Sequence, residues 1–254
     1  MRLLKNIALA ALAVVALSAS AEAKDWSTIR IGTEGAYPPF SFIDSNQQLQ
    51  GFDIDIAKAI CEKMNATCTF IAQDWDGIIP ALQAGKFDAI FSSMSITDER
   101  KKIVDFSRSY YNQPSSFIAA KGSGIKDVTP AGLKGKTIGA QSSTVQSSYL
   151  EETYPGFDIK LYPTQDEVNL DLAAGRIDVL LVDKLVGIDW LKSKSSECCE
   201  VVAEVPVGGG VGAAVRKEDP DLRDALSKAI LAVKADGTYD KINARYFPFS
   251  IWGD

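Results

Sequence analysis

Two distant stretches of the chain follow one pattern: a helix, a Gly, a basic residue, an apolar residue, an Asp and a buried strand. They are Leu82–Ser93 and Leu172–Asp183, and upstream of them Ile29–Glu34 resembles Thr137–Ser142. Strands that alternate with helices favour mainly parallel sheets. We therefore predict two α/β halves of related plan, unless the match reflects only a common αβ turn.

Local signals predict the elements of the first half. Asp53 has the character of a helix N-cap, and apolar residues recur at helical spacing after it. Gly85 is a natural end for a helix over 76–84, and Thr97 is predicted to cap a further helix. Strands are predicted over 28–33, 67–72 and 87–91.

The first residues have the order of a secretory signal peptide. Arg2 and Lys5 precede an apolar run over 7–17, and small residues then lead to Ala21-Glu22-Ala23. The apolar run is short for a membrane anchor, which is the alternative. We predict a signal peptide over 1–23, a mature chain that begins near Lys24, and export.

Composition excludes several functions. The chain has no His, so it cannot carry a Ser-His-Asp triad or a His-ligated zinc. The formal net charge of -6 argues against a nucleic-acid partner. We expect neither a metal nor a cofactor.

Export makes the cysteines informative, because disulfides persist in oxidising compartments. Cys61 and Cys68 bracket a turn between a predicted helix and strand. We predict a disulfide there, with two buried thiols as the alternative. Cys198 and Cys199 are adjacent and close only a strained ring, so free thiols or intermolecular pairing are open.

Open α/β sheets bind ligands beyond the carboxyl ends of their strands. Applied to both halves, this rule selects acids, hydroxyls and an aromatic residue. They are Glu34, Tyr37, Ser92, Ser93, Ser95, Ser142, Ser143, Thr144, Val145 and Asp183. If the halves face each other, these residues line one cleft. Arg100 lies in the first turn of the helix that follows Ser95.

This set suits a cationic α-amino acid. Arg100 would bind a carboxylate through its guanidinium, although it could be a solvated surface residue. Asp183 would accept an ammonium group, or it could only cap a helix. Glu34 would face a cationic side chain, or be an ordinary loop acid, and Tyr37 and Trp75 could flank that side chain. Core packing is the alternative for Trp75.

Several motifs occur along the chain in a characteristic order and spacing. They are Ile31–Glu34, Tyr37–Phe40, Gly51–Asp55, Ser92–Thr97 with Arg100, Ala174–Asp178, Val215–Asp219 and Ala235–Tyr239. This arrangement resembles a known family, the periplasmic solute-binding proteins of polar amino acid ABC importers. The resemblance covers 24–253 and is closest to the lysine/arginine/ornithine-binding and histidine-binding branch.

The resemblance implies an α/β, two-lobe, type II fold, in which each lobe is a mainly parallel sheet flanked by helices. Lobe 1 would combine 24–112 with 207–254, and lobe 2 would span 113–206. Hinges would lie near 112–115 and 205–208, on two crossing strands. Closure would trap an L-amino acid for a membrane-embedded ABC permease, and the protein would be a periplasmic monomer. The Cys61–Cys68 disulfide also matches this branch.

The resemblance also implies roles for individual residues. Arg100, Ser95, Thr144 and Val145 would bind the ligand carboxylate, while Asp183 and Ser93 would bind its ammonium group. The side-chain pocket would comprise Glu34, Tyr37, Trp75, Ser92, Met94 and Gln141.

Four positions depart from the pattern of the branch: Glu34, Trp75, Ser143 and Val145. They leave open the choice among arginine, ornithine, lysine and histidine, and an opine is a further alternative. There are two competing hypotheses. The protein could bind another polar solute, or it could be a dehydratase of the same fold. The dehydratase would need a general acid with a shifted pKa.

Overall fold

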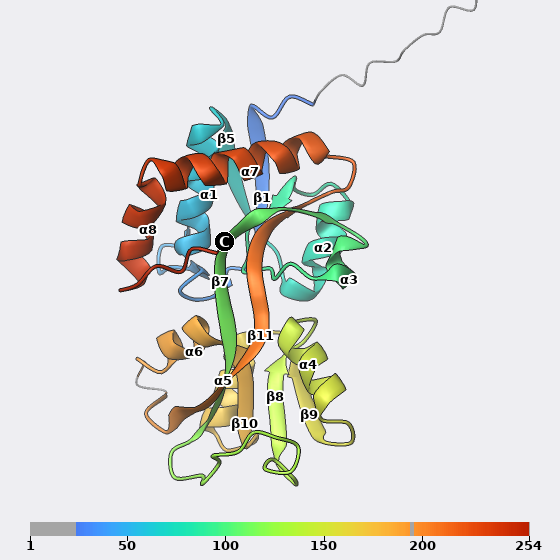
Figure 1. Ribbon diagram of the computed structural model, residues 1–254, viewed down its shortest axis with the longest axis vertical. Helices are drawn as coiled ribbons and strands as arrows, with labels where there is room; N and C mark the ends of the chain where they lie inside the picture. The colour runs from blue at the N-terminus through green and yellow to red at the C-terminus, as the bar shows by residue number, and fades with distance from the viewer. Residues whose placement is uncertain (1–23, 194–195, 254) are drawn as a thin grey trace, which may run out of the picture.

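The computed structural model describes residues 24–193 and 196–253. Its helices and strands gather in two groups that are bridged by the long strands β7 (Asp105–Ala120) and β11 (Cys199–Val215), as Figure 1 shows. The predicted signal peptide falls on 1–23, outside the described residues. Among the residues that are described, none of the helices combines the length and apolar character needed to cross a membrane.

One eight-stranded sheet runs through both groups in the order β5-β1-β6-β11-β7-β10-β8-β9. In the first group β1 (Thr28–Thr33) pairs in parallel with β5 (Thr67–Ala72) and β6 (Ala89–Ile90). In the second, β8 (Thr137–Gln141) pairs in parallel with β9 (Asp158–Tyr162) and β10 (Val179–Asp183). The predicted α/β class with mainly parallel sheets is confirmed.

The antiparallel pair β7 and β11 joins the two groups. Its register is interrupted between Val205 and Gly209, which pair with Ser115 and Gln113. The predicted hinge segments lie here, and bending at them stays a prediction, as do the lobe boundaries. A small sheet of β2 (Ala36–Tyr37), β3 (Ser41–Ile43) and β4 (Leu49–Gln50) lies apart from the main one.

Helices flank the sheet in both groups (Figure 1). In the first group α7 lies across the end of the molecule and packs on α1 and α8. The helices are α1 (Phe52–Lys63), α2 (Trp75–Gln83), α3 (Asp98–Lys101), α4 (Val145–Thr153), α5 (Gln165–Ala173), α6 (Lys184–Trp190), α7 (Pro220–Ala235) and α8 (Thr238–Tyr246).

The repeated sequence pattern has a repeated structural role. Asp88 accepts a hydrogen bond from the backbone of Arg30 in β1 at 3.0 Å, and Asp178 accepts one from Thr137 in β8 at 2.9 Å. Each Asp directly precedes a strand, β6 or β10, and therefore links that strand to the backbone of the neighbouring strand, β1 or β8. The two related halves predicted from the sequence are present.

The prediction that Asp53 caps a helix is wrong. Gly51 occupies the N-cap position of α1, and Asp53 lies inside the first turn. Its carboxylate instead accepts hydrogen bonds from the backbone of Ser93 at 2.7 Å and the hydroxyl of Tyr110 at 2.9 Å. At Asp53 a tertiary contact has therefore replaced the local cap. The predicted cap at Thr97 is confirmed, since its side chain accepts a hydrogen bond from the amide of Arg100.

Both pairs of cysteines form disulfides. The predicted Cys61–Cys68 bridge is confirmed and joins α1 to β5. Cys198 and Cys199 are also joined to each other. The sequence left the state of this pair open, and the structure joins the two sulfur atoms in one small ring at the start of β11.

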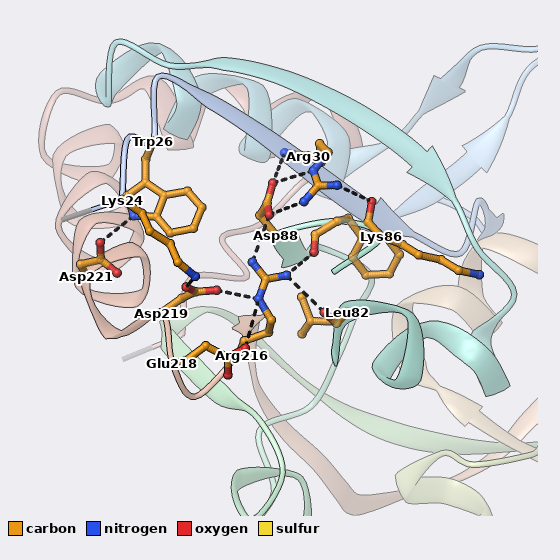
Figure 2. A network of polar contacts seen from close by, with 11 residues as sticks. Lys24, Trp26, Arg30, Leu82, Lys86, Asp88, Arg216, Glu218, Asp219 and Asp221 are labelled. Carbon is orange, nitrogen blue, oxygen red and sulfur yellow. Dashed lines mark hydrogen bonds and ion pairs between the residues drawn. The ribbon is translucent and has the colours of Figure 1, made fainter. Parts of the chain in front are cut away.

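A largely buried network of ion pairs joins segments of the first group that are far apart in the sequence, as Figure 2 shows. The guanidinium of Arg216 pairs with Asp88 at 3.1 Å and Asp219 at 2.7 Å, and donates to the backbone oxygen of Phe87 at 2.6 Å. Lys24 also pairs with Asp219. Because the arginine and both carboxylates are buried, each charge depends on its partners.

Candidate functional site

A cavity lies between the two groups of elements. It is lined by every residue to which the resemblance assigns a role except Met94, whereas Ser142 and Ser143, which the strand-end rule also selected, are not among the lining residues. The lining residues are Glu34, Tyr37, Trp75, Ser92, Ser93, Ser95, Arg100, Gln141, Thr144, Val145, Gln146 and Asp183.

Met94 lies outside this cavity. It is fully buried and packs in the cluster of apolar side chains that contains Trp75 and Phe87. The expectation that it lines the side-chain pocket does not match its position, because the side chain fills the core beneath Trp75.

The strand ends position most of the lining residues. Glu34 follows β1, and Ser92 and Ser93 follow β6. From the second group, Gln141 and Asp183 end β8 and β10. Parallel strands that end at one sheet edge place their following residues together, which is why the sequence could predict the set.

Arg100 presents its charge at one end of the cavity. Its Nη1 donates to the backbone oxygen of Ser95 at 2.9 Å, and its Nη2 to that of Ser143 at 3.2 Å. The guanidinium carbon lies 5.3 Å from the ring centre of Trp75. Burial lowers the pKa of Arg100 to about 10, so the group stays protonated at neutral pH. These neutral partners orient the cation and leave its charge for an anion.

The beginning of α4 supplies a second anion-binding feature from the opposite side. The hydroxyl of Thr144 caps the helix by accepting from the amide of Ser147 at 3.1 Å. Val145 begins the helix and Gln146 follows it. Backbone N–H groups at a helix N-terminus lack partners within the helix and favour negative charge.

Asp183 is the buried acid of the second group, with 5% of its surface exposed. Its carboxylate does not cap α6 and instead accepts from the hydroxyl of Tyr37 at 3.0 Å and from Gln146 Nε2 at 2.7 Å. Burial raises the pKa of Asp183 to about 6, and these hydrogen bonds oppose that rise. The arrangement holds an acceptor of positive charge against the cavity.

Glu34 is the acid of the first group and is 9% exposed. Its Oε1 accepts from Gln141 Nε2 at 2.6 Å, across the gap between the groups. Burial raises the pKa of Glu34 to about 7, with smaller contributions from Asp166, Asp74 and Asp76. A bound cation would offset both the cost of burying the ionised carboxylate and the repulsion from the neighbouring acids. This end of the cavity therefore favours positive charge.

Further hydrogen bonds join the two groups around the cavity. Trp75 Nε1 donates to the backbone oxygen of Ser143 at 3.2 Å, and the hydroxyl of Ser142 donates to Asp76 at 2.9 Å. The two groups therefore meet on the α2 side as well as through Glu34 and Asp183, and they enclose the cavity.

Gln146 is the lining residue that the sequence reasoning missed. Its Nε2 donates to Asp183 and, at 2.9 Å, to Ser115 Oγ, so it orients the buried acid. Its position directly after Thr144 and Val145, in the first turn of a capped helix, is the signal that could have identified it.

Comparisons with known proteins agree with this geometry. The family model for bacterial extracellular solute-binding proteins, family 3, matches residues 29–249. The chain is 42% identical to the L-arginine-binding protein of Pseudomonas aeruginosa, over 98% of this chain and 99% of the relative. It is 40% identical to the lysine/arginine/ornithine-binding periplasmic protein of Escherichia coli, over 98% of each.

A solved structure of an ancestral arginine-binding protein bound to arginine is also similar, with a TM-score of 0.82 and 38% identity. The match covers 87% of this chain and 98% of that one.

Proposed function

Because the chain belongs to family 3 of the bacterial extracellular solute-binding proteins, we propose that it binds a cationic L-amino acid in the periplasm. The candidate ligands are arginine, ornithine, lysine and histidine, the amino acids in the names of its relatives. The two lobes close on the ligand, and the closed form delivers it to the permease of an ABC importer.

The observation that carries the proposal is the arrangement of charge around one enclosed cavity. Arg100 offers a half-buried cation whose hydrogen bonds go to carbonyl oxygens, and Asp183 offers a buried acid from the facing group. Glu34 offers a second acid at the end near Gln141. A cationic α-amino acid carries the complementary anion and two cations, and charge-assisted hydrogen bonds are stronger than neutral ones.

Each lining residue that was predicted from the sequence has a role in this proposal, and Gln146 orients Asp183. Arg100, Ser95, Thr144 and Val145 bind the carboxylate, and Asp183 and Ser93 bind the ammonium group. Glu34, Tyr37, Trp75, Ser92 and Gln141 surround the side chain. Met94 supports Trp75 from the core and does not contact the ligand.

We propose binding without catalysis. Burial raises the pKa of both acids in the cavity, Glu34 and Asp183, as a general acid would require, but hydrogen bonds from neighbouring side chains hold each of them as suits a charge that pairs with a ligand. An acid used for proton transfer has to reach a reacting group.

Calorimetric titration tests the proposal. The purified protein is unfolded and refolded to remove any bound amino acid, and then titrated with arginine, ornithine, lysine and histidine. Glutamine and glutamate are the neutral and acidic controls. We expect at least one cationic amino acid to bind more tightly than both controls. Binding of glutamine or glutamate alone would overturn the proposal.

A further inference from the structure

Asp53 is a fully buried acid that lies behind the proposed ammonium site and does not line the cavity. It belongs to the first turn of α1, two residues after Gly51, the N-cap. The backbone amide of Ser93 donates to its Oδ2 at 2.7 Å, and the hydroxyl of Tyr110 donates to its Oδ1 at 2.9 Å. A buried carboxylate is costly, so its retention at this position calls for an explanation.

The residue that Asp53 contacts, Ser93, has an unusual backbone. Ser93 lines the cavity and adopts a φ of 50°, in the left-handed region that disfavours residues with a side chain. The bond from its amide to Asp53 holds the chain in this conformation. Such conformations persist where the surroundings determine them, and they are common at binding sites.

The hydroxyl of Ser93 has two further partners. The hydroxyl of Tyr111 lies 2.7 Å from Ser93 Oγ, and Asp53 Oδ2 lies 3.4 Å from it. Burial raises the pKa of Asp53 to about 7, and its ionised form only accepts hydrogen bonds. In that form the Ser93 proton points toward Asp53 and Tyr111 donates to Ser93. One lone pair of Ser93 Oγ is then left to accept from a ligand.

We propose that Asp53 is a positioning residue that makes Ser93 an acceptor for the ammonium group of the bound amino acid. This inference rests on the proposed function, in which Ser93 and Asp183 bind that group. Without the carboxylate, the Ser93 proton is free to point into the cavity, where it would oppose an N–H donor.

The same contacts connect the ammonium site to one of the bridging strands. Tyr110 and Tyr111 are consecutive residues of β7, and they contact Asp53 and Ser93 respectively. A ligand bound to Ser93 would thus be linked through hydrogen bonds to Tyr111 of β7. Asp53, on α1, bonds to Ser93 and to Tyr110 of β7.

The test compares two ligands against two variants. The ligands are L-arginine and the analogue of arginine that lacks the α-amino group. In Asp53→Asn we expect the affinity for L-arginine to fall by about tenfold or more. The reason is that Ser93 no longer accepts the charge-assisted hydrogen bond from the ammonium group of the ligand. The analogue should lose no more than about threefold, because it has no ammonium group. Equal losses for both ligands, or no loss for either, would overturn the inference.

Asp55→Asn is the matched control on the same helix. Asp55 accepts from Tyr246 at 2.6 Å and pairs with Arg245, away from the cavity. Its substitution should leave both affinities within about threefold of the parent, and a loss confined to L-arginine there would show that the Asp53 effect is not specific.

Two further variants keep the inference falsifiable if Asp53→Asn does not fold. Tyr111→Phe removes the other hydroxyl that orients Ser93 and should also weaken L-arginine selectively. Ser93→Ala should remove the same selectivity by itself, and equal effects on both ligands in these variants would overturn the inference. If the parent protein binds the two ligands equally, the proposed ammonium site has failed instead.

Discussion

Replacing Glu34 with Gln isolates the charge at the side-chain end of the cavity. The amide keeps the size of the side chain and an oxygen that can accept from Gln141, whose Nε2 lies 2.6 Å from Glu34 Oε1. The substitution therefore removes one negative charge and leaves the contact across the cavity. Since Glu34 is only 9% exposed, solvent screens this charge weakly.

The expected loss follows from the strength of a buried charge-assisted hydrogen bond, which contributes about 1.5–3 kcal/mol. At about 1.4 kcal/mol for each factor of ten, the affinity for arginine should fall about 10- to 150-fold in Glu34→Gln. Citrulline has nearly the same shape as arginine and a neutral side-chain end. Its affinity should change by less than about threefold, since no charge pair is lost.

Calorimetric titration of the parent and the variant with both ligands measures this difference. Thermal unfolding without ligand shows that the variant is folded. The reasoning predicts that the preference for arginine over citrulline collapses in Glu34→Gln. Parallel losses for the two ligands would refute it, because they would assign Glu34 to the shape of the cavity and not to its charge.

Three other predictions follow from the buried acids, the ion-pair network and a disulfide. Burial raises the pKa of Glu34 to about 7 and a bound cation favours the ionised form, so binding below pH 7 must release a proton. Arginine affinity should therefore fall as the pH is lowered from about 8 to 5, and a flat calorimetric profile over that range would be contrary evidence. Arg216→Met removes the buried cation between Asp88 and Asp219, which keep only the more exposed Arg30 and Lys24 as partners, and should lower the free energy of unfolding by about 3–5 kcal/mol. Urea denaturation measures this change, and one below about 1 kcal/mol would not agree. Replacing both members of the Cys61–Cys68 disulfide with Ser should cost about 2–3 kcal/mol in the same assay and leave arginine affinity unchanged. An unaltered urea midpoint would show that this bridge does not stabilise the fold.

The fold was predictable because the chain repeats one pattern and the parallel strands of both groups are short and bounded. The predicted strand over 67–72 is β5 as observed, and Gly85 follows α2 with a φ of 71°. The site was predictable for a related reason, since the residues after parallel strands gather at one edge of the sheet. Arg100 and Asp183 lie there together although they are far apart in sequence.

The errors lie where tertiary contacts replace local rules. Asp53 has the sequence character of a cap, but Ser93 and Tyr110, both distant in sequence, accommodate its carboxylate. Met94 follows two cavity residues, yet the turn directs it into the core. Whether adjacent cysteines pair depends on local backbone geometry, which the spacing of Cys198 and Cys199 does not reveal.

The central claim is that opposite charges from the two facing groups bind one zwitterion. The most direct measurement compares the affinity of the protein for L-arginine with that for agmatine, which is arginine without its carboxylate. Because Arg100 and the beginning of α4 would then have no anion to bind, we predict that agmatine binds at least about 100-fold more weakly. Equal affinity for agmatine and arginine would contradict the account, because the guanidinium of Arg100 would then have no part in recognition.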